Sequence, residues 1–332
     1  MTLTELKYIV AVAREKHFGK GADACHVSQP TLSVAIKKLE EELQVKLFER
    51  NANEITVTPL GEEIIRQAQS VLEQADNIRE IARRGKDPLA GALRLGVIYT
   101  IGPYLLPDLV RQAIAQTPQM PLMLQENYTA RLLEELRNGE IDCAILAEPF
   151  PDANLAIAPL YDEPFMTAVP SSHPLAERDN VTADEIKKET MLLLGTGHCF
   201  RDHVLEVCPE FARFSSNSDG IRKSFEGSSL ETIKHMVAAG MGITLVPRLG
   251  VPKEALAAQA AAKARQVVSK EAGLPVAAVE QPDFITYLPF EGHVPTRRVV
   301  LAWRRSFTRY EAIAALRNAI YACELPGVKR LS

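Results

Sequence analysis

Several features of secreted and membrane proteins are missing from this sequence. No run of about 18 apolar residues, as a transmembrane helix would need, occurs anywhere in it. The N-terminal residues MTLTELKYIV contain no basic stretch followed by an apolar core, so they do not resemble a secretory signal peptide. The five cysteines are odd in number and too scattered for a disulfide framework, since they lie at positions 25, 143, 199, 208 and 323. We expect a cytoplasmic protein whose thiols are reduced at rest and which has no contact with a membrane.

Signatures of the common enzyme classes are also missing. The sequence contains no glycine-rich phosphate loop, no G-x-S-x-G elbow and no H-E-x-x-H zinc motif. We therefore expect that the protein is not an enzyme and that it needs no cofactor and no metal ion. An excess of positive charge is missing as well, because the net charge is −4 and residues 1–58 hold eight Lys or Arg against eight Asp or Glu. Any binding of nucleic acid must then depend on segregated charge and on shape.

Chemically active side chains are concentrated in residues 195–208, GTGHCFRDHVLEVC. The two glycines predict a turn, and FRDHVLEV predicts a short helix that ends where Cys208 meets a proline. If this segment is helical, nine residues at a rise of about 1.5 Å place Cys208 about 13 Å from Cys199. A disulfide requires Cα atoms within about 7 Å, so oxidation of the pair would require the helix to unwind. Such a bond would act as a conformational switch.

The reactivity of Cys199 depends on how much of its thiol is ionised. A helix N-terminus and the positive charges of His198 and Arg201 both raise the thiolate fraction, so we expect a reactive cysteine here. Two other interpretations remain open. Both cysteines could be small buried side chains, or they could bind zinc together with His198 and His203, although their spacing matches none of the usual zinc motifs.

The first 58 residues predict a small helical domain with a hairpin. LTELKYIVAVARE and HFGKGADACHV are typical of two helices, and Ser28 with Pro30 begins a third, as N-cap and first-turn proline. The third helix has one apolar face, while the other carries side chains that could contact bases and phosphates: Thr31, Ser33, Val34, Lys37 and Lys38. A solvated face of any three-helix unit would look the same. FERNANEITVTP, which contains Arg50, predicts the wing of a winged helix-turn-helix and favours DNA binding.

From Thr58 onward the sequence predicts a long helix. Apolar side chains recur four and three residues apart, at Ile64, Ala68, Val71, Ala75, Ile78 and Ala82. This seam predicts a coiled-coil dimer, and a twofold dimer would present two DNA-reading domains to a pseudo-palindromic site. The helix is followed by RRGKDPLAG, whose glycine, proline and charge predict a linker.

The remainder of the 332 residues alternates predicted strands and helices. This alternation indicates an α/β domain with a mostly parallel sheet, covered by helices on both faces, that binds ligands beyond the carboxyl ends of its strands. Thr100 follows the first strand and Thr129 begins the helix after the second, so both hydroxyls could face the same crevice as Cys199. Helix capping by Thr129 and a loop role for Thr100 would explain the same residues. An alanine-rich segment, about 253–282, predicts a surface helix and loop to which we assign no function.

Taken together, these features resemble the LysR-type transcriptional regulators over nearly the whole chain. The signals are HVSQPTLSVAIKKLEEELQVKLFER and VAAGMGITLVP, and GHCFRDHVLEVC is similar to the peroxide-sensing branch of that family. The resemblance implies a winged helix-turn-helix DNA-binding domain (1–58), a linker and dimerisation helix (59–88) and an α/β regulatory domain (89–332). The regulatory domain would consist of two periplasmic-binding-protein-like subdomains, about 89–163 with 289–320 and about 164–288. The chain would cross to the second subdomain near Glu163 and return near Pro289.

The resemblance also implies the chemistry. Hydrogen peroxide would oxidise Cys199, the peroxidatic cysteine, to a sulfenic acid, and Cys208 would resolve it as a disulfide. The residues implied to hold peroxide or shape its pocket are Thr100, Thr129, His198, Arg201, Asp202 and Arg298, the last of which would stabilise the thiolate. The residues implied to contact DNA are Ser28, Gln29, Pro30, Thr31, Ser33, Lys37 and Arg50. Thiol reductants such as glutaredoxin with glutathione, or thioredoxin, would reset the oxidised protein.

Expected partners are the promoter DNA of antioxidant genes, further copies of the chain in a tetramer built from dimers, and RNA polymerase. Three departures from the family are visible. Gly21 replaces the usual alanine in the second helix, which should cost that helix roughly 1 kcal/mol. Asn53 and Glu54 stand in the wing where basic residues are common. The segment before Pro282 is longer than is usual in the family.

Two other functions remain open at this point. One is a LysR-type regulator that responds to a metabolite bound in the crevice, with incidental cysteines. The other is a thiol peroxidase, which would have no need of a recognition helix and a wing.

Overall fold

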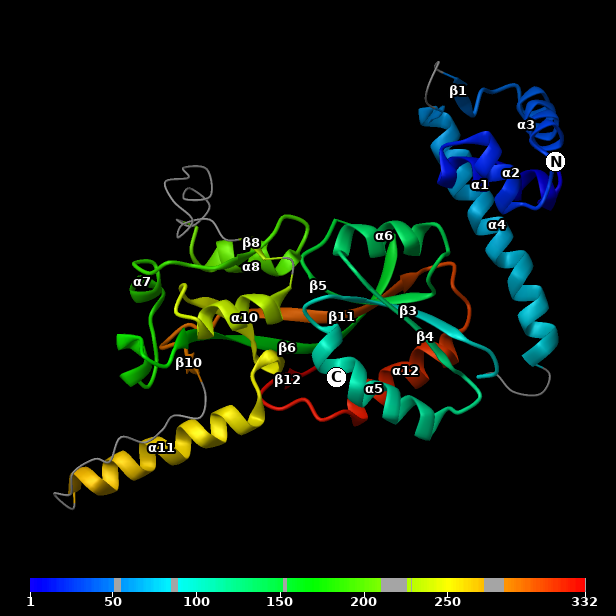
Figure 1. Ribbon diagram of the computed structural model, residues 1–332. Helices are drawn as coiled ribbons and strands as arrows, with labels where there is room; N and C mark the ends of the chain where they lie inside the picture. Colours follow the sequence, from blue (N-terminus) through cyan, green and yellow to red (C-terminus); the bar gives the residue numbers. More distant parts are fainter. Residues whose placement is uncertain are drawn as a thin grey trace.

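The computed structural model describes residues 1–50, 55–84, 89–151, 154–209, 226–227, 229–271 and 284–331. The wing tip with Asn53 and Glu54, residues 85–88 of the predicted linker and residues 272–282 of the alanine-rich segment lie outside the described residues, as do the side chains of Arg50 and Ala82. No helix in the described ranges is long and apolar enough to cross a membrane. Figure 1 shows a small helical domain at the N-terminus, a long helix leading away from it and a larger α/β domain.

The N-terminal domain consists of α1 (Leu3–Glu15), α2 (Phe18–Ala24), α3 (Gln29–Leu43) and the antiparallel pair β1 (Phe48–Arg50) and β2 (Ile55–Val57). Its helices begin at the predicted caps, since Thr2 forms a capping box and the Ser28 hydroxyl accepts the Thr31 N–H at 3.3 Å. The periodic apolar residues form its core, which includes Leu6, Ile9, Val12, Leu32, Ile36 and Leu39. The predicted winged helix-turn-helix is confirmed.

Gly21 allows α2 to lie unusually close to α1. A Cβ at this position would stand 2.9 Å from Val12 Cγ2 and 3.2 Å from Val12 Cα, closer than side chains normally approach. The glycine therefore lowers the helix propensity of α2, as expected from the sequence, but it also permits a contact that alanine would disturb.

Helix α4 (Pro59–Arg84) follows Thr58, whose hydroxyl accepts the Gly61 N–H at 2.9 Å. The predicted apolar seam on this helix is not uniform. Ile64 and Ala68 pack into the core of the N-terminal domain, whereas Val71 and Ile78 are 38% and 69% exposed. The first part of the seam thus stabilises its own domain, while the exposed Val71 and Ile78 are available to a partner, and the dimer stays a prediction. Helical spacing alone does not show which surface an apolar stripe covers.

The middle of α4 contacts the α/β domain through polar side chains. The Glu73 carboxylate forms an ion pair with Arg304, with 2.7 Å between Oε1 and Nε, and accepts a hydrogen bond from the Ser306 hydroxyl at 2.6 Å. Asn77 accepts a further bond from the Thr308 hydroxyl at 2.5 Å. These contacts join the linker helix to the residues at the end of one sheet strand and just beyond it.

The α/β domain is built on one sheet of eight strands. Its strands are β3 (Leu93–Ile98), β4 (Leu122–Asn127), β5 (Cys143–Glu148), β6 (Leu155–Pro170), β9 (Thr244–Pro247), β10 (Ile285–Pro289), β11 (Thr296–Arg304) and β12 (Lys329–Arg330). They run in the order β10-β6-β11-β5-β3-β4, and β9 and β12 also pair with β6. A further small pair joins β7 (Leu193–Leu194) and β8 (Glu226–Gly227).

The α/β class is confirmed, but the prediction of a mostly parallel sheet was wrong. β3 runs parallel to β4 and β5, whereas β11 is antiparallel to β5 and β6, and β6 is antiparallel to β9, β10 and β12. Strand direction is set by how distant segments pair, which local patterns do not encode.

Helices cover this sheet on both sides. They are α5 (Gly102–Gln116), α6 (Thr129–Arg137), α7 (Ala183–Ile186), α8 (Cys199–Val207), α10 (Leu230–Ala238), α11 (Lys253–Glu271) and α12 (Tyr310–Ala322), with short 3-10 turns at Pro174–Glu177 and Arg248–Gly250. In Figure 1, α6 lies on one face of the sheet and α5 and α12 lie on the other.

Two separate apolar cores lie in this domain. The first includes residues of β3, α5, α6 and α12, and the second includes residues of α8, α10 and β9. Along β6 the core changes between Tyr161 and Phe165, and the chain returns between Phe290 and Val299. We propose that the chain crosses between the two subdomains near Glu163 and Pro289, and this change of packing supports the proposal.

Part of the alanine-rich segment forms α11, which projects from the body of the domain in Figure 1. The first turns of α11 are anchored to the domain. Ala255 is 5% exposed, Gln259 exchanges hydrogen bonds with the backbone of Tyr287, and the Lys263 ammonium lies 2.7 Å from the Asp179 carboxylate.

Candidate redox site

Cys199 is the first residue of α8, and Cys208 is the residue after its end. Gly197 has φ +98°, a left-handed conformation that glycine adopts without strain, and it turns the chain into the helix. The predicted helix between the two cysteines is confirmed, and neither of them is in a disulfide. At about 1.5 Å per residue the helix separates them by about 13 Å. Cys208 is fully buried in the second core, while Cys199 is partly exposed.

Cys199 lines a small pocket to which three chain segments contribute. The lining residues are Ile98, Tyr99 and Thr100 after β3, Asn127, Tyr128 and Thr129 between β4 and α6, and Gly197, His198 and Cys199 before α8. Its volume of about 10 Å³ has room for a molecule about the size of one water. The structure thus brings Thr100, Thr129 and His198 together around Cys199, as the sequence led us to expect.

The arginine of this site is Arg297 and not Arg298. The Arg297 side chain is fully buried and donates to Glu163 Oε2 from Nε (2.9 Å) and Nη2 (2.8 Å). It also donates to the Thr100 hydroxyl at 2.7 Å and to the Thr100 carbonyl at 2.9 Å. Its guanidinium lies 5.3 Å from the centre of the Phe200 ring, which belongs to the residue after Cys199. Arg297 therefore connects the loop after β3 to the start of α8.

Arg298 points to the opposite side of β11, where its guanidinium pairs with Asp162 at 2.8 Å and is about half exposed. Successive side chains of a strand alternate between faces, so an error of one residue moves a side chain to the wrong face. Alternation in the sequence does not decide between them, because Arg297 is in phase with the apolar Val299 and Leu301, and Arg298 with the apolar Val300 and Ala302.

Arg201 and Asp202 lie on α8 but do not line the pocket. The Arg201 guanidinium is buried and donates to the Leu194 carbonyl at 2.9 Å, which fixes α8 to β7. Asp202 is exposed. Their prediction as pocket residues is corrected accordingly: Arg201 positions the helix, and Asp202 acts on the thiol through its charge alone.

Burial raises the pKa of the Cys199 thiol above its ordinary value. The Thr129 hydroxyl and the positive charge of Arg297 act in the opposite direction, and the charge of Asp202 adds to the increase. Burial therefore opposes the thiolate that the sequence led us to expect. The favourable charge comes from Arg297 and not from Arg201, which the sequence suggested, and the burial of the thiol outweighs it.

His203 is held as a structural residue of α8. Burial lowers the pKa of its imidazole, and its Nε2 lies 2.8 Å from the Glu148 carbonyl, which requires a proton on that nitrogen. Within the ranges that the structure describes, no group of three or more His, Cys, Asp or Glu side chains could hold a metal ion.

The predicted DNA-contacting residues gather at the start of α3. Ser28, Gln29, Pro30, Thr31 and Lys37 are exposed and Ser33 is half-buried. At the other end of the helix the Glu40 carboxylate accepts the N–H groups of Leu47 (2.8 Å) and Phe48 (3.3 Å). This contact fixes the wing strand β1 relative to the exposed face.

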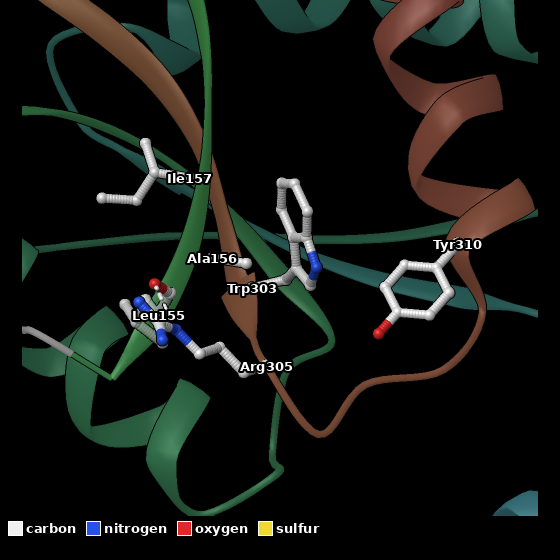
Figure 2. Close-up of a pocket in the computed structure, with 6 residues that line it drawn as sticks. All are labelled: Leu155, Ala156, Ile157, Trp303, Arg305 and Tyr310. Atoms are coloured by element: carbon white, nitrogen blue, oxygen red, sulfur yellow. Dashed lines mark hydrogen bonds between the residues drawn. The ribbon is translucent and has the colours of Figure 1, made fainter.

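A second hollow, shown in Figure 2, lies between β6, β11 and the start of α12. Its volume is about 540 Å³, and it is lined by Leu155, Ala156, Ile157, Trp303, Arg305 and Tyr310. Arg305 donates to the Leu155 carbonyl at 3.4 Å. It contains none of the site residues expected from the sequence, so the chemistry is assigned to the smaller pocket.

Comparisons with known proteins agree with the division into a DNA-binding domain and an α/β domain. Residues 3–62 match the family described as bacterial regulatory helix-turn-helix protein, lysR family, and residues 86–266 match the LysR substrate binding domain. The chain is 36% identical to the hydrogen peroxide-inducible genes activator of Pectobacterium carotovorum, over 95% of both chains. It is also 36% identical to the DNA-binding transcriptional dual regulator OxyR of Escherichia coli, over 95% of this chain and 94% of that one.

A full-length OxyR variant of Pseudomonas aeruginosa has a similar structure. It is 45% identical to the chain, the match covers 98% of this chain and 96% of that one, and the TM-score is 0.74. The winged helix-turn-helix, the α/β domain and these similarities along the length of the sequence show that the chain belongs to the LysR family of bacterial transcriptional regulators, together with the OxyR proteins.

Proposed function

We propose that the protein is a cytoplasmic, peroxide-sensing transcriptional activator of the OxyR type, switched by oxidation of Cys199. The observation that carries the proposal is one helix: α8 has Cys199 at its start, in a pocket with Thr100 and Thr129, and Cys208 at its end. The names of the relatives, hydrogen peroxide-inducible genes activator and DNA-binding transcriptional dual regulator, support the same function. The exposed start of α3 binds promoter DNA of antioxidant genes, and oligomers form partly through the exposed half of the α4 seam.

The proposed reaction begins with the thiolate of Cys199. Its sulfur attacks one oxygen of hydrogen peroxide, the O–O bond breaks, and the leaving hydroxide takes a proton to give water and a sulfenic acid. Arg297 stabilises the negative charge of the thiolate, and the Thr129 hydroxyl lies beside the sulfur. The Thr100 oxygen already accepts a bond from Arg297, so its own proton is available to the peroxide.

Resolution follows when the sulfur of Cys208 attacks the sulfenic sulfur and expels hydroxide, which becomes a second water. The α8 helix must unwind for this step, since about 13 Å separates residues that a disulfide holds within about 7 Å. Phe200 and Val204, each 2% exposed in the second core, must then move with the helix. Oxidation therefore changes the packing of the regulatory domain, and we propose that this change alters how the assembled protein holds DNA. Reduction by glutaredoxin with glutathione, or by thioredoxin, restores α8, and RNA polymerase is the partner that responds at the promoter.

The alternative of a metabolite-binding regulator is less well supported. Side chains of the protein itself occupy the junction between the two cores. Arg297 pairs with Glu163 there, the Tyr104 hydroxyl donates to Glu231 at 2.5 Å, and Lys234 donates to the Gly250 carbonyl at 2.9 Å. A thiol peroxidase, the other alternative, would not require the winged helix-turn-helix.

The proposal is tested by mapping thiols in the anaerobically reduced protein after one equivalent of hydrogen peroxide. A Cys199–Cys208 crosslink should form before any other thiol is lost, Cys199→Ser should form none and should still bind DNA, and Cys208→Ser should accumulate the sulfenic acid. Cys25→Ser is the matched control, because burial raises the pKa of this thiol too and it lies in the N-terminal core. If Cys199 stayed reduced while Cys25 reacted, the proposed switch would be wrong.

A further inference from the structure

Three aromatic rings meet above Cys199. The Tyr128 ring lies edge-on to the His198 ring with centroids 4.7 Å apart, and edge-on to the Tyr99 ring at 5.2 Å. The Tyr99 and His198 centroids are 5.9 Å apart. Each ring therefore contacts both others, and all three residues line the cysteine pocket. Edge-to-face contacts of this kind are favourable between aromatic rings, so the cluster is a defined arrangement.

The three rings differ in exposure, so the cluster has an outer and a buried side. Tyr99 and Tyr128 are 38% and 36% exposed, whereas His198 is 6% exposed. The two tyrosines thus form the outer surface of the cluster, and the imidazole is buried beneath them. The pocket that the three rings help to line has a volume of about 10 Å³, which fits a molecule of about the size of water.

The backbone fixes the two tyrosines in place. Tyr99 directly follows β3, and Tyr128 is the residue before α6, with its N–H donating to the Asn127 side chain at 3.0 Å. Gly197 makes room for the Tyr128 ring, since a Cβ there would lie 3.3 Å from Tyr128 Cδ1. The tyrosines come from the first core unit and His198 from the segment that begins α8, so the cluster closes across the junction of the two.

We propose that Tyr99 and Tyr128 form an aromatic gate that admits hydrogen peroxide to Cys199 and excludes hydroperoxides with bulky carbon groups. The inference rests on the proposed role of Cys199 as the peroxidatic thiol. Hydrogen peroxide has only one oxygen atom more than water, so it needs at most a small shift of the rings to reach the sulfur. A tert-butyl or cumyl hydroperoxide would oxidise the same thiol to a sulfenic acid and release an alcohol, but its carbon group must displace Tyr128 to bring the O–O bond to the sulfur.

The test measures the loss of the Cys199 thiol in the reduced full-length protein, by rapid quench and mass spectrometry, with hydrogen peroxide, tert-butyl hydroperoxide and cumene hydroperoxide. The readout is the rate of Cys199 oxidation by an organic hydroperoxide divided by the rate with hydrogen peroxide. A change in the reactivity of the thiol itself affects both rates alike and leaves this ratio unchanged. Tyr128→Ala and Tyr99→Ala should each raise this ratio by about tenfold, in the range that steric discrimination in an apolar pocket gives. Tyr128→Phe keeps the ring and should keep the low ratio.

Tyr310→Ala is the matched control, since this tyrosine is 56% exposed and lies outside the pocket, and it should leave the ratio unchanged. Far-ultraviolet circular dichroism checks that each variant is folded. An unchanged ratio in both alanine variants would overturn the gate while leaving the proposed function standing. A ratio that rose as much in Tyr128→Phe as in Tyr128→Ala would also overturn it, because the hydroxyl and not the ring would then matter. Failure of Cys199 in the unmodified protein to react with any peroxide would overturn the gate together with the proposed function.

Discussion

Two adjacent arginines on β11 allow a sharp test of the energetics of the site. Arg297→Met and Arg298→Met remove the same charge at neighbouring positions, and Met retains much of the arginine stem. Arg297 is fully buried with Glu163, which is also fully buried, whereas Arg298 is about half exposed beside Asp162. The two substitutions should therefore differ widely in their effects on stability.

The expected magnitudes follow from burial. Without Arg297, the Glu163 carboxylate keeps the N–H of Leu249 at 2.8 Å but loses its only described cationic partner in direct contact. Breaking a buried ion pair on one side costs about 3–5 kcal/mol. At about 2–4 °C per kcal/mol for a domain of this size, Tm should fall by roughly 6–20 °C. An exposed pair contributes about 0–1 kcal/mol, so Arg298→Met should lower Tm by at most about 4 °C.

The assay is calorimetric unfolding of the reduced protein, with the rate of Cys199 oxidation by hydrogen peroxide as a second readout. Arg297→Met should also slow that oxidation, because the positive charge that favours the thiolate is gone. Adding Glu163→Leu to Arg297→Met removes the orphaned carboxylate and should recover much of the lost stability but not the rate. Equal changes in Tm for the two single variants would refute the assignment of Arg297 as the buried arginine of the site.

Two further predictions concern pH and the N-terminal domain. Because burial raises the pKa of Cys199, the thiolate is the minor form near neutrality, and the rate with hydrogen peroxide should rise about tenfold per pH unit until the pH passes that pKa; stopped-flow rates that stay flat from pH 6 to 9 would contradict this. Gly21→Ala should gain about 1 kcal/mol of helix propensity but cost about 1–3 kcal/mol through the close contact with Val12. Thermal melts should therefore show an unchanged or lower Tm. A clear rise in Tm would show that α1 and α2 separate easily.

The features that could be read from the sequence are those that local chemistry decides. The α8 helix followed from two glycines, an amphipathic stretch and a proline after Cys208, and Ser28 began α3 because its side chain satisfies a free N–H. Thr100 and Thr129 were found because both stand where a strand gives way to a helix. In each case the deciding partners lie within a few residues along the chain.

The features that were missed depend on distant partners. Arg297 was passed over for Arg298 because the face of a strand is settled by its neighbours in the sheet, here β5 and β6. The burial that raises the pKa of Cys199 could not be foreseen, since it comes from packing against the first core and not from its own helix. Tyr99 and Tyr128 were overlooked although each adjoins a threonine that was identified, because their rings meet only once the two segments are brought together.

Strand β11 has a mechanical consequence. At one end it carries Arg297 in the cysteine site, and at the other it carries Arg304, which is paired with Glu73 of the linker helix. Seven residues at about 3.3 Å place these two anchor points about 23 Å apart on one extended segment, and β5 and β6 hold it along both edges. The hydrogen bonds along both edges keep the strand extended, apart from a local irregularity in its pairing with β6 between Val299 and Val300. If α8 unwinds as proposed, a movement of Arg297 would reach the linker helix along this strand, because Arg304 at its other end contacts Glu73.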